Sequence, residues 1–86
     1  MSMTRINSPA VTARTTDVYS SNAWHATVTA PGVDGYTFVC WTHCSSAGWV
    51  GSAYVANPTA ETSEVWSHDS WPEGKAVKCT ALYVRS

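Results

Sequence analysis

The sequence has few charged residues and few of the side chains that favour helices. Charged residues make up 13% of the 86 residues, and the net charge is −1. The chain has one Leu, one Ile, three Glu, two Lys and no Gln, so strong helix formers other than Ala are scarce. Its five basic residues are scattered. That scatter argues against nucleic acid as a partner, because neutralising phosphates requires a basic stripe.

Long hydrophobic runs are also missing. No apolar run approaches the roughly 20 residues of a membrane-spanning helix, so we expect no membrane partner. The segment 1–9 lacks the apolar core of a secretory signal. We therefore expect a protein that works inside a cell or leaves it by a route that needs no signal.

Residues that favour β-strands dominate the chain. Val, Thr, Ser and Ala are frequent, and there are five Trp and four Tyr. Short runs of β-branched and aromatic residues alternate with turn formers, and they predict strands over 17–20, 24–30, 36–43, 49–56, 63–68 and 76–85. The sequence thus predicts an all-β domain, a small antiparallel β-sandwich or jelly roll of about six strands.

The ends and turns define the predicted boundaries. Residues 1–16 are polar and irregular and predict an arm, either flexible or paired with a sheet edge or a neighbouring subunit. Residues 17–86 then form a single β domain. Asp34-Gly35 predicts a hairpin turn, and Gly51 predicts a bulge or a close backbone approach inside a strand. A homotrimer is expected, since self-association would cover exposed sheet edges and support a small core.

Three cysteines raise the question of a metal or a disulfide. On a regular strand Cys40 and Cys44 share a face while His43 points away, and no Cys-x-x-Cys pair is present. We therefore expect no metal site and no cofactor. Cys40 and Cys79 are predicted to be small buried side chains on interior strand faces. A disulfide between these two cysteines is the alternative.

A catalytic constellation is not recognisable in the sequence. No nucleophile elbow is present, and the adjacent His68 and Asp69 fall in a turn region, where neighbouring side chains diverge. The carboxylates that glycoside hydrolysis would need lie mostly in or beside turns, where solvation is the default. We expect no enzymatic activity, with a small hydrolase as the alternative.

The aromatic residues divide into a predicted core and a predicted binding site. The core set lies in the predicted strands and consists of Tyr36, Phe38, Trp41, Trp49 and Tyr83. Two further Trp flank short polar residues near a strand end and in the following loop, an arrangement that suits the faces and hydroxyls of a sugar. The predicted ligand-binding set is Trp66, His68, Asp69, Ser70 and Trp71. Alternatively, Trp71 covers the core or lies in a subunit interface.

The strand pattern between Trp24 and Arg85 also carries a resemblance. The runs 36–41, 48–54 and 79–85, above all Gly-Trp-Val-Gly-Ser and the ending Ala-Leu-Tyr-Val-Arg, resemble the C-terminal β domain of minor structural proteins in phages and prophages of Gram-positive bacteria. These are tail-fibre, baseplate or head-fibre proteins. No active residues transfer, because the likeness is a strand pattern.

The resemblance implies a location and partners. It implies a virion protein made in the bacterial cytoplasm, trimeric, in contact with other virion proteins and binding a host cell-surface glycan. The chain would then be a fragment or a small stand-alone protein. The alternative is a purely structural virion component without a ligand, such as a head fibre or capsid decoration protein.

Overall fold

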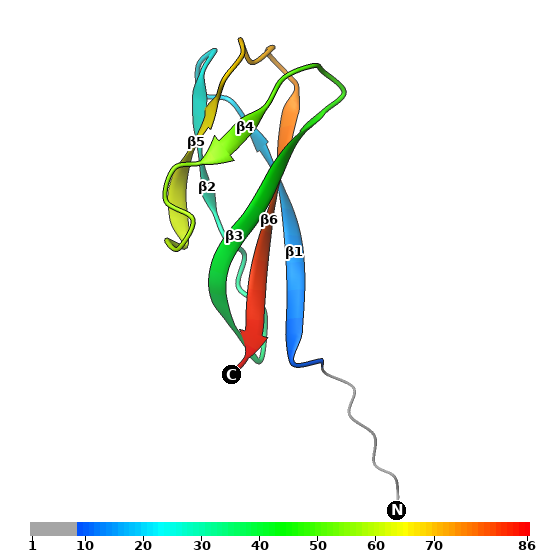
Figure 1. The fold of residues 1–86 in the computed structure, drawn as a ribbon, viewed down its shortest axis with the longest axis vertical. Helices are drawn as coiled ribbons and strands as arrows, with labels where there is room; N and C mark the ends of the chain where they lie inside the picture. Colours follow the sequence, from blue (N-terminus) through cyan, green and yellow to red (C-terminus); the bar gives the residue numbers. More distant parts are fainter. Residues whose placement is uncertain (1–8) are drawn as a thin grey trace, which may run out of the picture.

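Residues 9–86 are described in a computed structural model of the chain, and their strands form two antiparallel sheets (Figure 1). One sheet has the order β1-β6-β3 and the other the order β2-β5-β4. The six strands are β1 Val11–Tyr19, β2 His25–Thr29, β3 Tyr36–Ala47, β4 Ala53–Val55, β5 Thr62–Ser67 and β6 Ala76–Arg85. The predicted all-β class, with a sandwich-like arrangement, is confirmed.

The first strand begins earlier than the sequence predicts. Residues 11–16, which the sequence assigns to the arm, pair in register with β6 of the same chain. Their sequence is mostly Thr, Ala and Arg, so the apolar alternation that marks a half-buried strand is weak there. Backbone pairing to the central strand β6 overrides that weak pattern. Residues 1–8 of the predicted arm lie outside the described residues.

The fourth strand is much shorter than predicted. The sequence predicts a strand over 49–56, whereas β4 contains only Ala53–Val55. Trp49 leaves the strand path and lies against Gly51, where an added Cβ would come within 2.1 Å of the indole ring. Gly51 itself lies outside any strand, and its close neighbour is the Trp49 side chain, so the predicted bulge or close backbone approach inside a strand is wrong.

The predicted turn between β2 and β3 forms, but the predicted hairpin is wrong. Gly35 has a φ of 80°, and the Tyr36 amide donates to the Val33 carbonyl at 3.0 Å. However, β2 pairs with β5 and β3 pairs with β6, so the turn connects the two sheets. A tight turn fixes the reversal of the chain and leaves open which sheet the next strand joins.

Two irregularities in β3 decide which side chains face the core. The pairing with β6 slips between Phe38 and Cys40 and again between Trp41 and His43. Each bulge adds one residue to β3 and shifts the alternation of faces by one. Trp41 and Cys44 therefore pair with inward-facing residues of β6, whereas Cys40 pairs with Leu82 on the outer face. The prediction that Cys40 and Cys44 share a face is wrong.

The bulges also explain why β3 has apolar residues at both odd-numbered and even-numbered positions. The sequence predicts that 36–43 is covered on both sides, but residues 9–86 form only two layers and leave the outer face of β3 uncovered. Phe38 is at an even-numbered position and Trp41 at an odd-numbered one, so a regular strand would place them on opposite faces, yet both contact the core. The bulge between them turns both rings inward.

The core fills the space between the two sheets. Tyr83 is 1% exposed and donates its hydroxyl to the Pro31 carbonyl at 2.6 Å; desolvation raises the pKa of this phenol. Trp41 donates from Nε1 to the Ala60 carbonyl at 2.9 Å, which ties β3 to the loop between β4 and β5. The predicted core rings Trp41 and Tyr83 are buried, and Tyr36, Phe38 and Trp49 pack against the core half-buried.

Candidate functional site

The outer face of the β2-β5-β4 sheet carries a row of rings. In the strand register, His25 of β2 lies opposite Trp66 of β5, and Trp66 lies opposite Tyr54 of β4. Opposed residues share a sheet face, and the alternate residues of β5, Ser63, Val65 and Ser67, are buried. These rings therefore cross the solvent side of the whole sheet. We call His25, Trp66, Tyr54 and the neighbouring His68 the aromatic row.

The rings of the aromatic row contact one another in pairs. The His25 and Trp66 rings stack at 4.7 Å between centroids with an interplanar angle of 18°. The Tyr54 and His68 rings lie 4.9 Å apart at 31°. Tyr54 is 45% exposed, and His68 is exposed as well. The row thus places partly exposed rings across the full width of the sheet, with one face of His25 and one face of Trp66 turned toward each other.

Hydrogen bonds hold the two stacked rings in place. The Asn22 side-chain oxygen accepts from the backbone amides of Trp24 and His25, at 2.8 and 3.1 Å. Its amide nitrogen is then the donor to Nδ1 of His25, 2.8 Å away. This network assigns the proton of the neutral imidazole to Nε2. Trp66 donates from Nε1 to the Glu64 carboxylate at 3.1 Å.

Polar groups flank the aromatic row on both sides. Thr27 and Glu64 are paired on the same outer face, one pleat away from His25 and Trp66. Beyond β5, the Asp69 carboxylate accepts from the Ser52 amide at 3.2 Å. The row is therefore bordered by hydroxyl and carboxylate oxygens.

The structure separates the predicted ligand-binding residues. Trp66 and His68 belong to the aromatic row, and Asp69 and Ser70 are exposed in the loop that follows. Trp71 is 2% exposed; its Nε1 donates to the Lys75 carbonyl, and its ring stacks on Trp49 with centroids 6.1 Å apart. Trp71 covers the core, which is the alternative that the sequence left open.

Two members of the aromatic row, His25 and Tyr54, escape detection from the sequence. The alternation of residues 24–30 indicates a polar face that contains His25. What the sequence does not show is the register, which places His25 on one side of Trp66 and Tyr54 on the other. Pairing between strands distant in sequence therefore creates the row.

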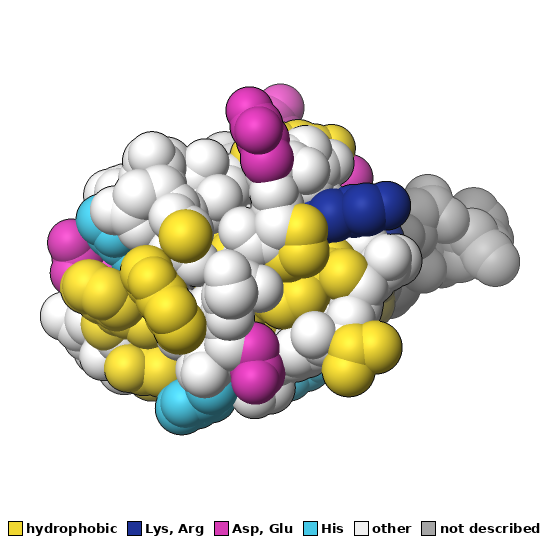
Figure 2. Space-filling view, turned by 90° about the horizontal axis from the view of Figure 1, so that it is seen from above, with side chains coloured by type: hydrophobic (Ala, Val, Ile, Leu, Met, Phe, Trp, Pro, Cys, Tyr) yellow, Lys and Arg dark blue, Asp and Glu magenta, His cyan; other side chains and the backbone are white. Residues whose placement is uncertain are grey.

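The loops next to the aromatic row gather at one end of the sandwich. Segments 20–24, 48–52 and 68–75 meet there, joined by bonds such as that from the Trp71 amide to the Ala23 carbonyl. Figure 2 views this end and shows exposed hydrophobic side chains among mostly uncharged ones. Val50, at 98% exposure, and Trp24, at 48%, lie in these segments.

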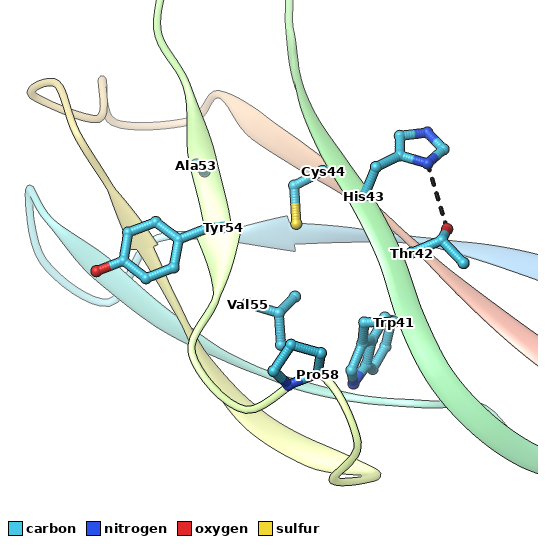
Figure 3. A pocket seen from close by; sticks show the side chains of 8 residues that line it. All are labelled: Trp41, Thr42, His43, Cys44, Ala53, Tyr54, Val55 and Pro58. Atoms are coloured by element: carbon cyan, nitrogen blue, oxygen red, sulfur yellow. Dashed lines mark hydrogen bonds between the residues drawn. The ribbon is translucent and has the colours of Figure 1, made fainter.

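A cavity opens on the side of the sandwich where β3 and β4 lie side by side. Its volume is about 330 Å³. Figure 3 shows Cys44 pointing into it while His43 points away. The lining residues are Trp41, Thr42, His43, Cys44, Ala53, Tyr54, Val55 and Pro58. The described residues that line the cavity include no Lys, Arg, Asp or Glu.

The cysteines form a different pair from the one predicted. Cys44 lies opposite Cys79 in the register, with the two Sγ atoms 3.2 Å apart. Cys40 lies opposite Leu82, three positions further along β6, so the alternative disulfide between Cys40 and Cys79 is wrong. Cys79 is buried as predicted, whereas Cys40 is half-buried on the outer face.

Clusters of metal-ligating side chains and membrane-spanning helices are both absent from residues 9–86. No three His, Cys, Asp or Glu side chains come close enough there to hold a metal ion. Within the same range there is no helix long and apolar enough to cross a membrane.

No family model matches the chain, and comparisons with curated proteins and with solved structures give no match either.

Proposed function

We propose that this domain binds a neutral saccharide chain across the aromatic row. The observation that carries this proposal is the row itself, in which His25, Trp66 and Tyr54 cross the outer face of one sheet. The C–H faces of a sugar stack on aromatic rings, whose faces carry partial negative charge. The flanking oxygens of Thr27 and Glu64 supply partners for hydroxyl groups.

The charges around the row favour a neutral ligand over an acidic one. The carboxylates of Glu64 and Asp69 border the rings, and a carboxylate or phosphate on the ligand would be repelled. Trp66 is held in one orientation by its bond to Glu64. A preformed platform of this kind loses little conformational entropy when a ligand binds.

The place of this binding in biology is proposed from the resemblance described above. The domain would sit at the tip of a fibre or baseplate of a phage that infects Gram-positive bacteria and would bind a host cell-surface glycan. A homotrimer would bring three copies of the row together, so weak binding at each would be multiplied.

Removal of a ring from the aromatic row tests this proposal. We expect Tyr54→Ala and Trp66→Ala each to weaken binding about tenfold, the loss of one stacked contact of about 1.4 kcal/mol. Binding is measured first on an array of neutral and acidic oligosaccharides and then by calorimetry with the best neutral ligand. Tyr19→Ala is the matched control, because Tyr19 is 59% exposed on the other sheet.

The outcomes separate the possibilities. Unchanged affinity in Tyr54→Ala and Trp66→Ala, with a wild-type protein that binds, would move the site elsewhere. A wild-type protein that binds no glycan on the array, even at the high density of an immobilised trimer, would refute saccharide binding.

A second candidate is a purely structural protein that associates with copies of itself. The outer face of the β1-β6-β3 sheet supports it, because three Val side chains lie exposed toward one end. They are Val11 at 49%, Val39 at 39% and Val84 at 39%. Val11 and Val84 are paired in the register. We propose that this Val patch lies in the interface of a homotrimer.

A charge placed in the Val patch tests the interface. We expect Val84→Lys to convert the native oligomer to monomer, since an unpaired ammonium would be desolvated in the contact. The mass is measured by light scattering. Ser45→Lys, at the far end of the same face beside Lys78 in the register, should leave the mass unchanged. A monomeric wild-type protein at high concentration would contradict the trimer.

A further inference from the structure

The positions of Cys44 and Cys79 allow a disulfide bond to form between them. The two residues are opposed on neighbouring antiparallel strands, and their Sγ atoms lie 3.2 Å apart. Opposed antiparallel residues have Cα atoms about 4.5–5.5 Å apart. That separation lies within the roughly 4.4–6.8 Å that a disulfide spans. A bond between them therefore needs side-chain rotation and no rearrangement of the sheet.

Only one of the two thiols is open to a reagent. Cys79 is fully buried at 0% exposure, whereas Cys44 is half-buried and lines the cavity between β3 and β4 (Figure 3). The hydrogen bond between the two thiols lowers the pKa of Cys44, against a smaller opposing contribution from burial. The same contact, with burial, raises the pKa of Cys79. Cys44 is thus both the accessible thiol and the one that ionises first.

The cavity in front of Cys44 selects its reagents by polarity and size. Its walls include the Trp41 ring, Val55 and Pro58, and its described lining contains no Lys, Arg, Asp or Glu. A volume of about 330 Å³ admits a small organic molecule. A neutral aromatic or aliphatic group would lie against these walls, whereas a charged group would lose hydration without gaining a partner.

We propose that Cys44 and Cys79 form an exchange-active dithiol that reacts with small neutral organic disulfides entering the cavity between β3 and β4. In the first step the Cys44 thiolate attacks one sulfur of the disulfide. A mixed disulfide forms on Cys44, the bond between the two reagent sulfurs breaks, and one thiolate leaves and takes a proton from water.

The second step closes the protein disulfide. The Cys79 sulfur attacks Sγ of Cys44, the mixed disulfide breaks, and the Cys79 proton passes to the departing thiolate. Overall, two protein thiols are oxidised to one disulfide and one reagent disulfide is reduced to two thiols. The third cysteine, Cys40, lies on the outer face opposite Leu82 and has no thiol partner in this scheme.

The test uses the full chain carrying Cys40→Ser, with 2,2′-dithiodipyridine as the neutral reagent and glutathione disulfide as the charged one. We expect two equivalents of pyridinethione per chain, and peptide mapping by mass spectrometry should find Cys44 joined to Cys79. Relative to a free cysteine peptide, the neutral reagent should be favoured over the charged one by about tenfold or more.

Two variants in the same background assign the steps. Cys79→Ser should release one equivalent and retain a stable mixed disulfide on Cys44, while Cys44→Ser should react slowly, at the buried thiol alone. Circular dichroism checks that both are folded. A rapid first step in Cys44→Ser would overturn the proposal. So would a fully reacted Cys40→Ser protein that carries two mixed disulfides and no bond between Cys44 and Cys79.

Discussion

Replacing Trp71 by alanine is expected to lower the free energy of unfolding by about 3–5 kcal/mol. The indole is 2% exposed and is the largest group that the loop between β5 and β6 contributes to the core. The substitution removes its stacking on Trp49 and its hydrogen bond to the Lys75 carbonyl. It also leaves a cavity in a domain of 86 residues, whose total stability is expected near the lower end of roughly 5–15 kcal/mol.

The measurement is urea denaturation followed by circular dichroism, so that the loss of a Trp does not alter the probe. Trp66→Ala is the matched control, because this indole lies on the outer face of β5 and its removal leaves no internal cavity. We expect the control to lose about 1 kcal/mol or less. Equal losses for the two variants would mean that Trp71 does not contribute to the core in the way its burial indicates.

Trp71 also shows where the sequence was informative and where it was not. Its position between Ser70 and Pro72 in a predicted loop suggested an exposed ring. The loop does form, but the Trp71 amide donates to the Ala23 carbonyl, which fixes the backbone close to the sandwich. Whether a loop Trp turns inward depends on the space between the sheets, and no local pattern encodes that space.

Strand β6 is the element that the sequence predicts most completely. The predicted range 76–85 coincides with the observed strand, and Val77, Cys79, Ala81 and Tyr83 alternate into the core. β6 is the central strand of its sheet, so both its edges are paired and one face is fully covered. In β6, the β-strand propensity of the residues, their apolar alternation and their tertiary environment all favour the same strand. Such agreement allows a strand to be predicted from sequence.

Strand β3 is harder to read, because its two bulges interrupt the alternation. The rule that every second residue shares a face predicts one face for Cys40 and Cys44, and the single slip in register between Trp41 and His43 reverses that outcome. A bulge arises from the way two paired strands fit together, so the sequence of a single strand gives little indication of it. The pairing of Cys44 with Cys79 therefore could not be predicted from the sequence, although the sequence contains both residues.

The aromatic row illustrates the same limit for function. Trp66 and His68 were predicted as part of a binding surface, and both lie on the outer face of the sheet or at its edge. Their neighbours His25 and Tyr54 come from strands about 41 and 12 positions away along the chain, in register with Trp66. Composition predicted a surface of rings and short polar groups, and the register decides which rings meet.

Oxidation of the Cys44–Cys79 pair is expected to raise the free energy of unfolding by about 4 kcal/mol. The two cysteines are 35 positions apart, and closing a loop of that length in the unfolded chain costs about 12–13 cal/mol/K of entropy, or about 4 kcal/mol at room temperature. For a domain of this size, the midpoint of thermal unfolding should rise by roughly 20 °C.

The structural reason is the position of the bond. β3 is an edge strand of its sheet, and the bond would fasten it to the central strand β6 beside the cavity between β3 and β4. The disulfide would then restrain the local separation of β3 from β6 as well as the global unfolding of the domain. Because the opposed residues are already within disulfide reach, we expect little native-state strain to offset the entropic gain.

The comparison that checks this prediction is made between oxidised and reduced forms of one protein, so that side-chain changes do not enter. In the Cys40→Ser background, urea denaturation without reductant should give a higher midpoint than denaturation with it. Cys79→Ser should show no such difference, since Cys44 then has no partner in the sheet. An oxidised protein whose Cys44–Cys79 bond is verified by mass, yet whose midpoint equals that of the reduced form, would show that the bond distorts β3 by as much as it restrains the unfolded chain.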